Sequence, residues 1–509
     1  METKNIITNY RDAVKPMTRT DIAQYLIAAD SQRVLLTSVE KDELTFFMQE
    51  FFAELKQLHY NNVLPEERWH LYTYNSDIAS LHFDLIGGYS IDKGAEGKNF
   101  HIRSNGAQGY GYLGNFSGIY FSLRDNQEGG SRFDQGKTFT PSNGQVVARS
   151  LNDFFEYDPY DVQVNFDISF LRLSIEKSHN VWGSGERGNV ILSTKAPSFP
   201  QIKLHVKLGK EMTFTYLHGW LSSGIIDSLN SYTVANIPGS TGFRKIYKQK
   251  FIAAHILEIS LWKGVDIALG ESEVYGGRGP EILYLIPIMF FKAGEHYSDD
   301  TDNSQFFGNI DLSLIKNHNM YLSLFIDEFS TEEFYRTDRQ RNQLGFTVGT
   351  HSYDLLFPNT HLNIEYTRIN PWAYNHKFPD ATYQSHGYNL GHWIGQNADL
   401  FFAGADYRPM RNLKVGAQFE SVRKGGKMPT HFQYELPTPE FLYGPLIKNQ
   451  SYGINARYEP LRDLFIDMNA LITSYSQESD VPGVFQFPRV SSDYSRQFDF
   501  YLALRYNFQ

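Results

Sequence analysis

The sequence contains no cysteine among its 509 residues. This absence excludes a disulfide-stabilised scaffold, a cysteine nucleophile and a thiolate metal site. The chain also has no long run of basic residues, and its formal net charge is −10 at pH 7. Because nucleic-acid binding depends on positive charge, the composition argues against a nucleic-acid partner.

Long hydrophobic runs are also missing. A membrane-spanning helix needs about 18 consecutive apolar residues, whereas the longest candidate, residues 282–291, has about half that length and contains Pro287. Residues 1–15 are polar and lack the apolar core of a secretory signal. If the protein crosses an inner membrane, we expect that a signal was removed from this sequence.

The aromatic content, by contrast, is high, with 39 Phe, 33 Tyr and 6 Trp. A large β-rich core and the aromatic girdles of a membrane β-barrel both need such rings. The mean hydropathy of −0.41 suits either class, because only alternate residues of a barrel strand face lipid. The chain length suits several soluble domains or one large barrel, so the order of the residues has to decide.

The N-terminal part of the chain has the periodicity of helices. Residues 18–29 place apolar side chains on one face, and Thr37 and Glu40 match the T-x-x-E capping box. Apolar residues then recur at spacings of three and four, at Leu44, Phe47, Phe51, Leu55 and Leu58. We predict a hairpin of two amphipathic helices within residues 1–65, on the periplasmic side of a barrel or as its plug. A separate small helical domain is the alternative.

From about Leu71 onward the hydrophobic period becomes two. Four segments that alternate apolar and polar side chains are residues 162–170, 202–208, 413–420 and 464–473. A soluble sandwich alternates in the same way, but here the pattern repeats along most of the chain without a helix long enough for a parallel crossover. We therefore predict an all-β membrane protein in which residues 66–509 form a transmembrane antiparallel β-barrel. At about 24 residues per strand and turn, this length gives about 18 strands.

Residues 497–508 are the clearest strand, because Phe498, Phe500, Leu502, Leu504, Tyr506 and Phe508 alternate with more polar residues. The segment resembles the aromatic-ended closing strand by which bacterial barrels are recognised for insertion, although Gln509 follows Phe508. Because a bilayer tolerates no open sheet edge, we expect it to pair with an early strand near residues 81–85. Phe500 should face lipid and Asp499 the lumen.

Three stretches carry recognisable motifs. Residues 180–204 contain W-G-x-G at positions 182–185, followed by I-L-S and F-P, and residues 366–399 end on G-Q-N-A-D. The third stretch is the helical start with the first strands. Together they resemble the capsule assembly Wzi family, outer-membrane barrels that act as surface lectins. The resemblance implies a barrel of this size, a small periplasmic helical bundle and binding of capsular polysaccharide at the cell surface.

Two glycine-rich loops are candidates for ligand contacts. Residues 182–188 offer a Trp that can stack on a sugar and an Arg that can bind carboxylates; the alternative is a turn whose glycines fold the loop inward and narrow the barrel. Residues 275–280 favour an ordinary turn with Arg278 exposed, since they lack the Lys and Ser/Thr of a phosphate loop. The nearby acidic residues 299–303 do not match a calcium-binding EF-hand loop and predict a solvated loop.

Residues 370–393 combine rings with polar donors, as a sugar site requires, although an interface girdle with a structured external loop would have the same composition. The three histidines there, His376, His386 and His392, do not have zinc-protease spacing. The candidate glycan-binding residues in external loops are Trp182, Arg187, Arg278, Trp372, Tyr374, His376 and Trp393.

We predict a non-enzymatic protein of the bacterial outer membrane that attaches or organises capsular or exported polysaccharide at the cell surface. Its expected partners are that polysaccharide, outer-membrane lipids and the barrel-assembly machinery, with no cofactor or metal. The alternative is an outer-membrane channel or exporter for a polar solute or polysaccharide, because the sequence does not show whether the lumen is open or plugged. An enzyme is disfavoured, because no Ser/His/Asp set can be placed together from the sequence.

Overall fold

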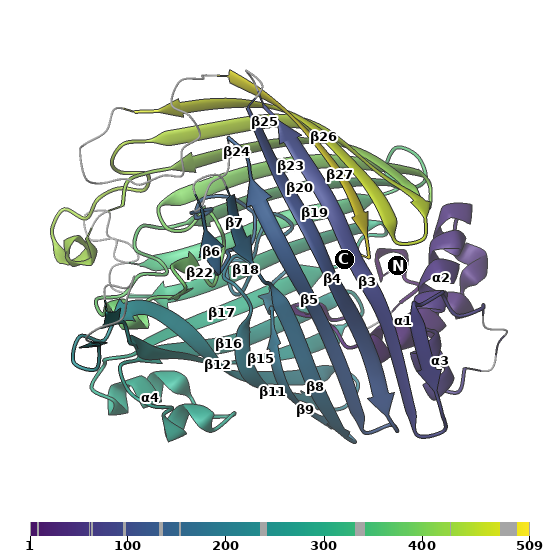
Figure 1. The fold of residues 1–509 in the computed structure, drawn as a ribbon, viewed down its shortest axis with the longest axis horizontal. Helices are drawn as coiled ribbons and strands as arrows, with labels where there is room; N and C mark the ends of the chain where they lie inside the picture. The colour runs from purple at the N-terminus through teal and green to yellow at the C-terminus, as the bar shows by residue number, and fades with distance from the viewer. Residues whose placement is uncertain are drawn as a thin grey trace.

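A computed structural model describes residues 2–7, 10–60, 62, 65–94, 98–131, 136–151, 154–234, 242–330, 342–427, 429–478 and 496–507. It contains a closed barrel of 18 antiparallel strands (Figure 1), which confirms the predicted fold class and strand number. In order around the wall the strands are β3 (Ala79–Lys93), β4 (Asn99–Leu113), β5 (Ser117–Gly129), β8 (Tyr160–Ile168), β9 (Leu171–Ser178), β11 (Phe199–Lys207), β12 (Met212–Ile226), β15 (Tyr247–Trp262), β16 (Val265–Gly276), β17 (Asn303–Leu312), β18 (His318–Glu328), β19 (Gln343–Tyr353), β20 (Thr360–Ile369), β23 (Ala398–Met410), β24 (Leu413–Lys424), β25 (Ile447–Leu461), β26 (Leu464–Gln477) and β27 (Arg496–Tyr506).

The barrel closes where its last strand, β27, pairs with its first, β3. The sequence correctly predicted that the last strand pairs with an early strand. The pairing was expected near residues 81–85, but β27 pairs with residues 87–93 of β3. The reason is a short additional strand, β2 (Tyr72–Asn75), which pairs with residues 80–83 of β3. Phe508 lies outside the described residues.

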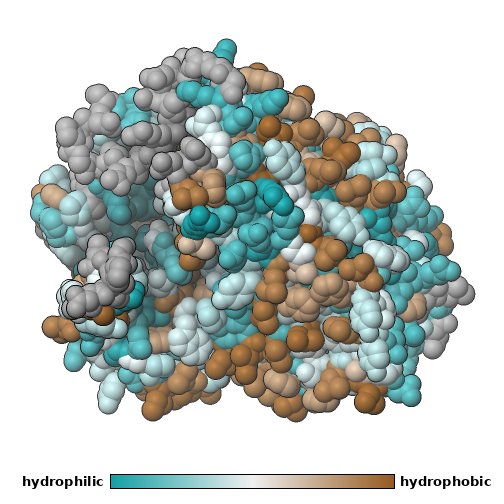
Figure 2. All heavy atoms as spheres, viewed as in Figure 1, coloured by the Kyte–Doolittle hydropathy of each residue, from teal (hydrophilic) through white to brown (hydrophobic). Residues whose placement is uncertain are grey.

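The side chains of β27 alternate between the two faces of the wall. Phe500 and Leu502 are 38% and 39% exposed on the outside, whereas Ala503 is 1% exposed. The same alternation on other strands gathers hydrophobic side chains over broad areas of the outer wall (Figure 2). Such an outward apolar surface is the one that an outer-membrane barrel presents to lipid.

The two ends of the barrel differ in their connections. At one end the strands are joined by tight turns, such as residues 411–412 and 462–463. At the other end long loops join them, including residues 179–198, 277–302 and 370–397. Outer-membrane barrels have short periplasmic turns and longer extracellular loops, so the long loops mark the outward-facing rim.

The N-terminal helices lie beside the end with tight turns (Figure 1). They are α1 (Arg19–Ser31), α2 (Ser38–Glu50) and α3 (Phe52–Gln57), with 3-10 turns η1 (Glu2–Lys4) and η2 (Arg33–Leu35). The predicted capping box is present, since Thr37 and Glu40 exchange both hydrogen bonds. The second predicted helix is broken at Phe51 into α2 and α3. Among the described residues, no helix is both long and apolar enough to cross a bilayer.

Apolar contacts hold the helices together and ion pairs hold them to the barrel. Their buried cluster includes Ala23, Ala29, Leu44, Met48, Phe51 and Leu55. Contacts to the tight turns and strand ends are Lys207 with Asp21, Lys4 with Asp354, Arg408 with Glu43, and Arg462 with the side chain of Gln49. The helical segment is therefore fastened at several points around one rim.

One long loop folds from the other rim into the lumen. Within residues 179–198, strand β10 (Val181–Trp182) pairs with β1 (Val14–Lys15), so the N-terminal segment also reaches the lumen. Trp182, Val190, Ile191 and Leu192 join a buried cluster with inward-facing residues of the wall, among them Leu217, Ile252, Phe307 and Phe325. The loop and the N-terminal segment meet inside the barrel.

Residues 370–397 complete this plug. They form the 3-10 turn η5 (Pro379–Ala381) and the two-residue strands β21 (Gln384–Ser385) and β22 (Tyr388–Asn389). Their apolar side chains belong to the same buried cluster. Both loops pack against the inner wall and together form a plug within the lumen.

The loop of residues 277–302 folds the other way, onto the outside of the wall. It contains the 3-10 turn η4 (Ile282–Leu285) and helix α4 (Phe291–Tyr297), which lies outside the strands in Figure 1. Leu269, Glu271 and Tyr275 share the outward face of β16, but only Leu269 is open, at 60% exposed. The loop covers the other two, with the rings of Tyr284 and Tyr275 centred 4.9 Å apart.

Candidate functional site

The glycines of residues 182–188 turn this loop inward, which was the alternative to a ligand loop. Gly183 and Gly188 have φ values of 109° and 144°, which L side chains rarely adopt. A Cβ at Gly188 would lie 2.8 Å from the ring of His392. Trp182 is fully buried and its ring centroid lies 5.8 Å from that of Phe307. This Trp packs the plug and has no open face for a sugar.

Carboxylates of the inner wall hold the backbone of the same loop. The N–H groups of Glu186 and Arg187 donate to the carboxylate of Glu365 at 2.6 and 3.1 Å. The Arg187 guanidinium forms an ion pair with Glu420 at 2.6 Å, and its side chain is 25% exposed. Its charge is therefore already matched within the plug.

The second plug loop places its rings in the same interior. The Tyr374 hydroxyl donates to the carbonyl of Val190 at 2.6 Å, which ties the two loops together. The indole N–H of Trp393 donates to the carbonyl of Arg187 at 2.8 Å. Trp372 stacks on Tyr443 with ring centroids 5.7 Å apart. All three of these rings are buried, so in this structure they connect loops to one another.

Two histidines of this loop have lost much of their basicity. Burial lowers the pKa of His376 to about 4 and that of His392 to about 3. Both imidazoles are neutral near pH 7, because burial disfavours the charged form. His376, predicted to contact a glycan, is partly buried and offers hydrogen bonds in place of a positive charge.

Arg278 is not the exposed residue of an ordinary turn. Its guanidinium binds both carboxylate oxygens of Asp302, at 2.8 and 2.6 Å, and Tyr284 donates to the same carboxylate at 2.7 Å. Asp302 is 1% exposed, so the prediction of a solvated acidic loop is wrong at this residue. The pair fastens the outer loop to the start of β17, because Asp302 immediately precedes that strand.

A cavity of about 880 Å³ lies between the plug and the wall strands β3, β4, β5 and β27. Its lining includes the cations Arg124, Lys137 and Arg505, the acids Asp158 and Asp161, and the rings of Tyr157 and Tyr501. Lys137 pairs with Glu128 and Arg505 with Asp467. Ser90, Ser104 and Asn126 add hydroxyl and amide groups. The volume is within the usual range for ligand pockets, and the combination of cations, rings and small polar groups suits a polar ligand with anionic groups.

The seven residues predicted to bind glycan do not form one site. Trp182, Arg187, Trp372, Tyr374 and Trp393 belong to the plug, His376 lies at its edge and Arg278 lies in the outer loop. Within the described part of the chain, none of them lines the cavity. The sequence contained a signal for the cavity in the inward, polar rows of the first and last strands, but these positions become neighbours only when the barrel closes.

A closed wall with an outward apolar surface, tight turns at one rim and long loops at the other defines an outer-membrane β-barrel protein. Within that class, the family model for capsule assembly protein Wzi matches residues 162–463, and the chain belongs to this family. The matched region covers the plug loops and most of the wall.

Comparison with one solved structure supports the fold. Wzi, an outer-membrane protein involved in group 1 capsule assembly in Escherichia coli and a carbohydrate-binding β-barrel, aligns with a TM-score of 0.56 and 12% identity, covering 100% of this chain and 96% of that one. OprD of Pseudomonas aeruginosa aligns with a TM-score of 0.44 and 11% identity, over 84% and 93% of the two chains. No curated protein sequence matches the chain.

Proposed function

We propose that this protein is a glycan-binding barrel of the outer membrane that attaches or organises capsular or exported polysaccharide at the cell surface. Membership of the Wzi family supports this function. The observation that carries it is the cavity, lined by both polar and apolar groups, between the plug and strands β3, β4, β5 and β27. A plugged lumen suits retention of a polymer better than free diffusion of solutes.

The lining of the cavity favours an acidic polysaccharide. Arg124 and Arg505 place guanidinium groups in the lining, which can bind carboxylates in two places, although Arg505 also pairs with Asp467. The rings of Tyr157 and Tyr501 supply apolar faces and hydroxyl groups. Each contact should be weak, because polar sugar groups give up water for imperfect partners. Strong retention of a long polymer would then come from repeated engagement.

The seven originally predicted residues take different roles in this proposal. Arg278 and His376, which are partly exposed, would contact the polymer from the rim. Trp182, Trp372, Tyr374 and Trp393 would act indirectly, by holding the plug that forms one side of the cavity. Arg187 would hold the same plug through Glu420.

We further propose that residues 1–65 form an N-terminal unit, with its helices on the periplasmic side and residues 14–15 in the lumen, and that residues 66–509 form the barrel. The position of the helices beside the tight turns supports this division. Outer-membrane lipids would cover the apolar wall, and the barrel-assembly machinery would insert it. The proposal assigns no catalytic reaction to the chain.

The test is binding of the purified barrel in detergent to a uronic-acid polysaccharide, measured by calorimetry. The variant Arg124→Ala/Tyr501→Ala should weaken binding at least about tenfold, the effect of losing more than about 1.4 kcal/mol. Arg244→Ala is the matched control, because Arg244 is an exposed arginine in a long loop outside the cavity. Equal binding by the cavity variant would place the site elsewhere.

A second measurement separates the proposal from the channel alternative. Liposomes that contain the barrel should not swell in isotonic solutions of small sugars, because the plug loops obstruct the lumen. A protein that binds no acidic glycan and admits sugars at porin-like rates would be a channel.

A further inference from the structure

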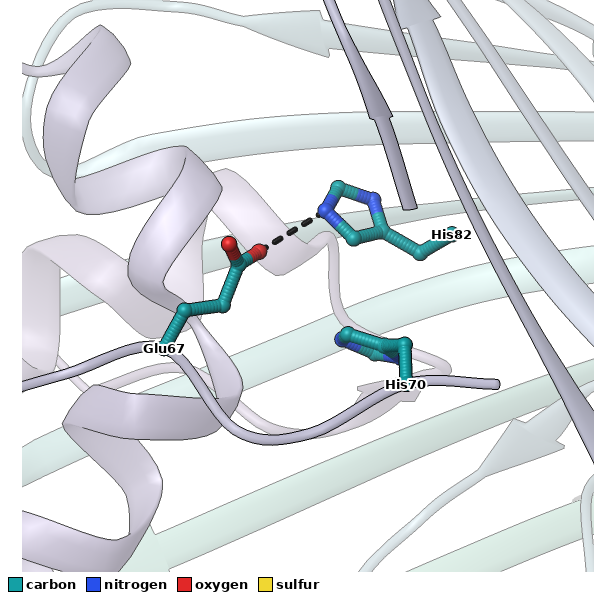
Figure 3. A group of neighbouring side chains, drawn as sticks. All are labelled: Glu67, His70 and His82. Carbon is teal, nitrogen blue, oxygen red and sulfur yellow. Dashed lines mark hydrogen bonds and ion pairs between the residues drawn. The ribbon is translucent and has the colours of Figure 1, made fainter. Parts of the chain in front are cut away.

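Two histidines and a glutamate converge where the helical segment joins the barrel (Figure 3). Glu67 and His70 lie in the segment between α3 and β2, and His82 lies in β3. One potential ligand atom from each lies within 4.8 Å of the others. The side chains of His70 and His82 are each 1% exposed, and that of Glu67 is 21% exposed. The group is buried except on the glutamate side.

Two buried ring nitrogens of the group, His70 Nε2 and His82 Nδ1, have no hydrogen-bond partner among the described residues. His70 places Nδ1 2.8 Å from a carboxylate oxygen of Asp84, while its Nε2 is buried without a hydrogen-bond partner among the described residues. A buried polar atom with no partner costs about 1–3 kcal/mol. The hydrogen bonds within the protein therefore leave Nε2 of His70 unsatisfied. A ligand bound to this atom would supply the missing partner.

The contact between His70 and Asp84 resembles the hydrogen bond by which a carboxylate supports a metal-binding histidine. In metal sites the non-ligating nitrogen of a histidine usually donates to a carboxylate, which fixes the ring and makes the other nitrogen a better ligand. Asp84 is itself held by the Arg68 guanidinium and by the backbone N–H of Leu71 at 3.1 Å. The imidazole of His70 is thus oriented with Nε2 as its available atom.

The surrounding charges can accommodate an added cation. Arg68 forms ion pairs with Glu50, Asp84 and Asp463, each from a different element of the chain. With Glu54 and Glu67, five carboxylates are close to this region, and the nearby cations are Arg19, Arg68, Arg462 and Lys56. The local excess of negative charge favours a dication.

We propose that Glu67, His70 and His82 bind a divalent transition-metal ion, with two imidazoles and one carboxylate as ligands. Nitrogen and oxygen donors of this kind suit zinc, and three protein ligands leave a fourth position for water. Tetrahedral ligands at zinc distances lie about 3.4 Å apart, so His70 would move toward the other two side chains by about an ångström. The hydrogen bond of 2.8 Å between His82 Nε2 and Glu67 would open to admit the ion.

The site would fasten the helical segment to the wall. Glu67 and His70 precede the first strand, so a metal shared with His82 connects the linker to β3. This attachment adds to the Arg68 ion pairs, which already join α2, β3 and the turn after β25. Metal binding would stabilise the folded state in proportion to its affinity.

The test is zinc binding by the full-length barrel in detergent, purified without a histidine tag and treated with EDTA. Calorimetry and elemental analysis should give about one bound Zn²⁺ per chain. His70→Ala and Glu67→Gln should each lower the affinity at least about tenfold. His296→Ala is the control, because His296 lies in α4 and its side chain is 63% exposed. With Co²⁺ in place of Zn²⁺, the wild type should show tetrahedral d–d bands that both ligand variants lose.

Three results would overturn the proposal. They are the absence of stoichiometric zinc in the wild type, unchanged affinity in both ligand variants, and an equal loss in His296→Ala. Heat-dependent migration on gels reports whether each variant is a folded barrel. If His70→Ala does not fold, Glu67→Gln decides the matter, since it leaves both histidines and the Asp84 contact in place.

Discussion

Two long loops leave the same rim of this barrel and fold in opposite directions. Residues 179–198 enter the lumen, where the ring of Trp182 is buried and the wall carboxylate of Glu365 accepts from two loop N–H groups. Residues 277–302 lie outside the wall. There the loop covers the wall acids Glu271 and Glu273, which are 4% and 0% exposed.

The difference shows that a loop adapts to the surface it covers. The inner loop packs its apolar side chains against apolar residues of the inner wall and of the second plug loop, while its backbone donates to the wall carboxylate of Glu365. The outer loop satisfies Glu271 with the backbone N–H of Phe291 at 2.8 Å and leaves Ile288 and Phe290 exposed at 83% and 56%. Its outermost face thereby continues the apolar exterior of the barrel.

The largest difference should come from paired truncations in the two loops. Trp182→Ala leaves a cavity in the plug and should lower the free energy of unfolding by about 3–5 kcal/mol. Ile288→Ala removes an exposed side chain and should cost less than about 0.5 kcal/mol in detergent. Denaturant unfolding in detergent micelles measures both. Equal costs would mean that the two loops are packed alike.

The wall itself sharpens the comparison. Phe500→Asp puts a charge on the lipid-facing row and should cost up to about 2 kcal/mol, whereas Asp499→Ala should change insertion little. Insertion yield into liposomes measures the difference. Ile288→Asp should behave like Phe500→Asp if the outer loop continues the lipid-facing surface. Equal yields for the two β27 variants would reverse the assignment of faces.

A smaller effect is expected from the hydrogen bonds of the inner loop. Glu365→Gln weakens the acceptor of the Glu186 and Arg187 N–H groups and should cost about 1–2 kcal/mol. Planar-bilayer recordings should show more frequent channel openings, because the plug is held less firmly. Glu271→Gln, the matched change under the outer loop, should leave the conductance unchanged. If channel openings are equally frequent in Glu365→Gln and Glu271→Gln, Glu365 does not hold the plug.

The smallest effect tests a region distant from both loops. Thr37→Ala removes the capping box of α2 and should cost about 1 kcal/mol. Hydrogen exchange should increase in residues 38–50 alone. Faster hydrogen exchange in residues 179–198 as well would show that the stability of the helices and that of the plug are coupled.

Local patterns in the sequence predicted the elements well. The capping box at Thr37 and Glu40 and the alternation through Phe500 depend on neighbouring residues, and both are present in the structure. The strand number followed from length alone. These features need no knowledge of what each segment contacts.

Contacts between distant segments were the part that the sequence could not give. Nothing near Trp182 indicates that Phe307 will bury its ring, and nothing near Arg278 indicates the pairing with Asp302. The Glu67, His70 and His82 group was also missed, because eleven residues separate the two histidines and the hairpin of β2 and β3 brings them together. A ring-rich loop has the same composition whether it binds a ligand or packs a plug.

The pairing of β1 with β10 has a consequence for the order of folding. Residue 14 meets residue 182 inside a ring that closes only when residue 506 meets residue 87. Neighbouring strands form hairpins over short loops, whereas these two contacts each join widely separated parts of the chain, and such contacts form slowly. The rate-limiting events of folding should therefore involve the two ends of the polypeptide: one end must be in the lumen, and the other must seal the wall around it.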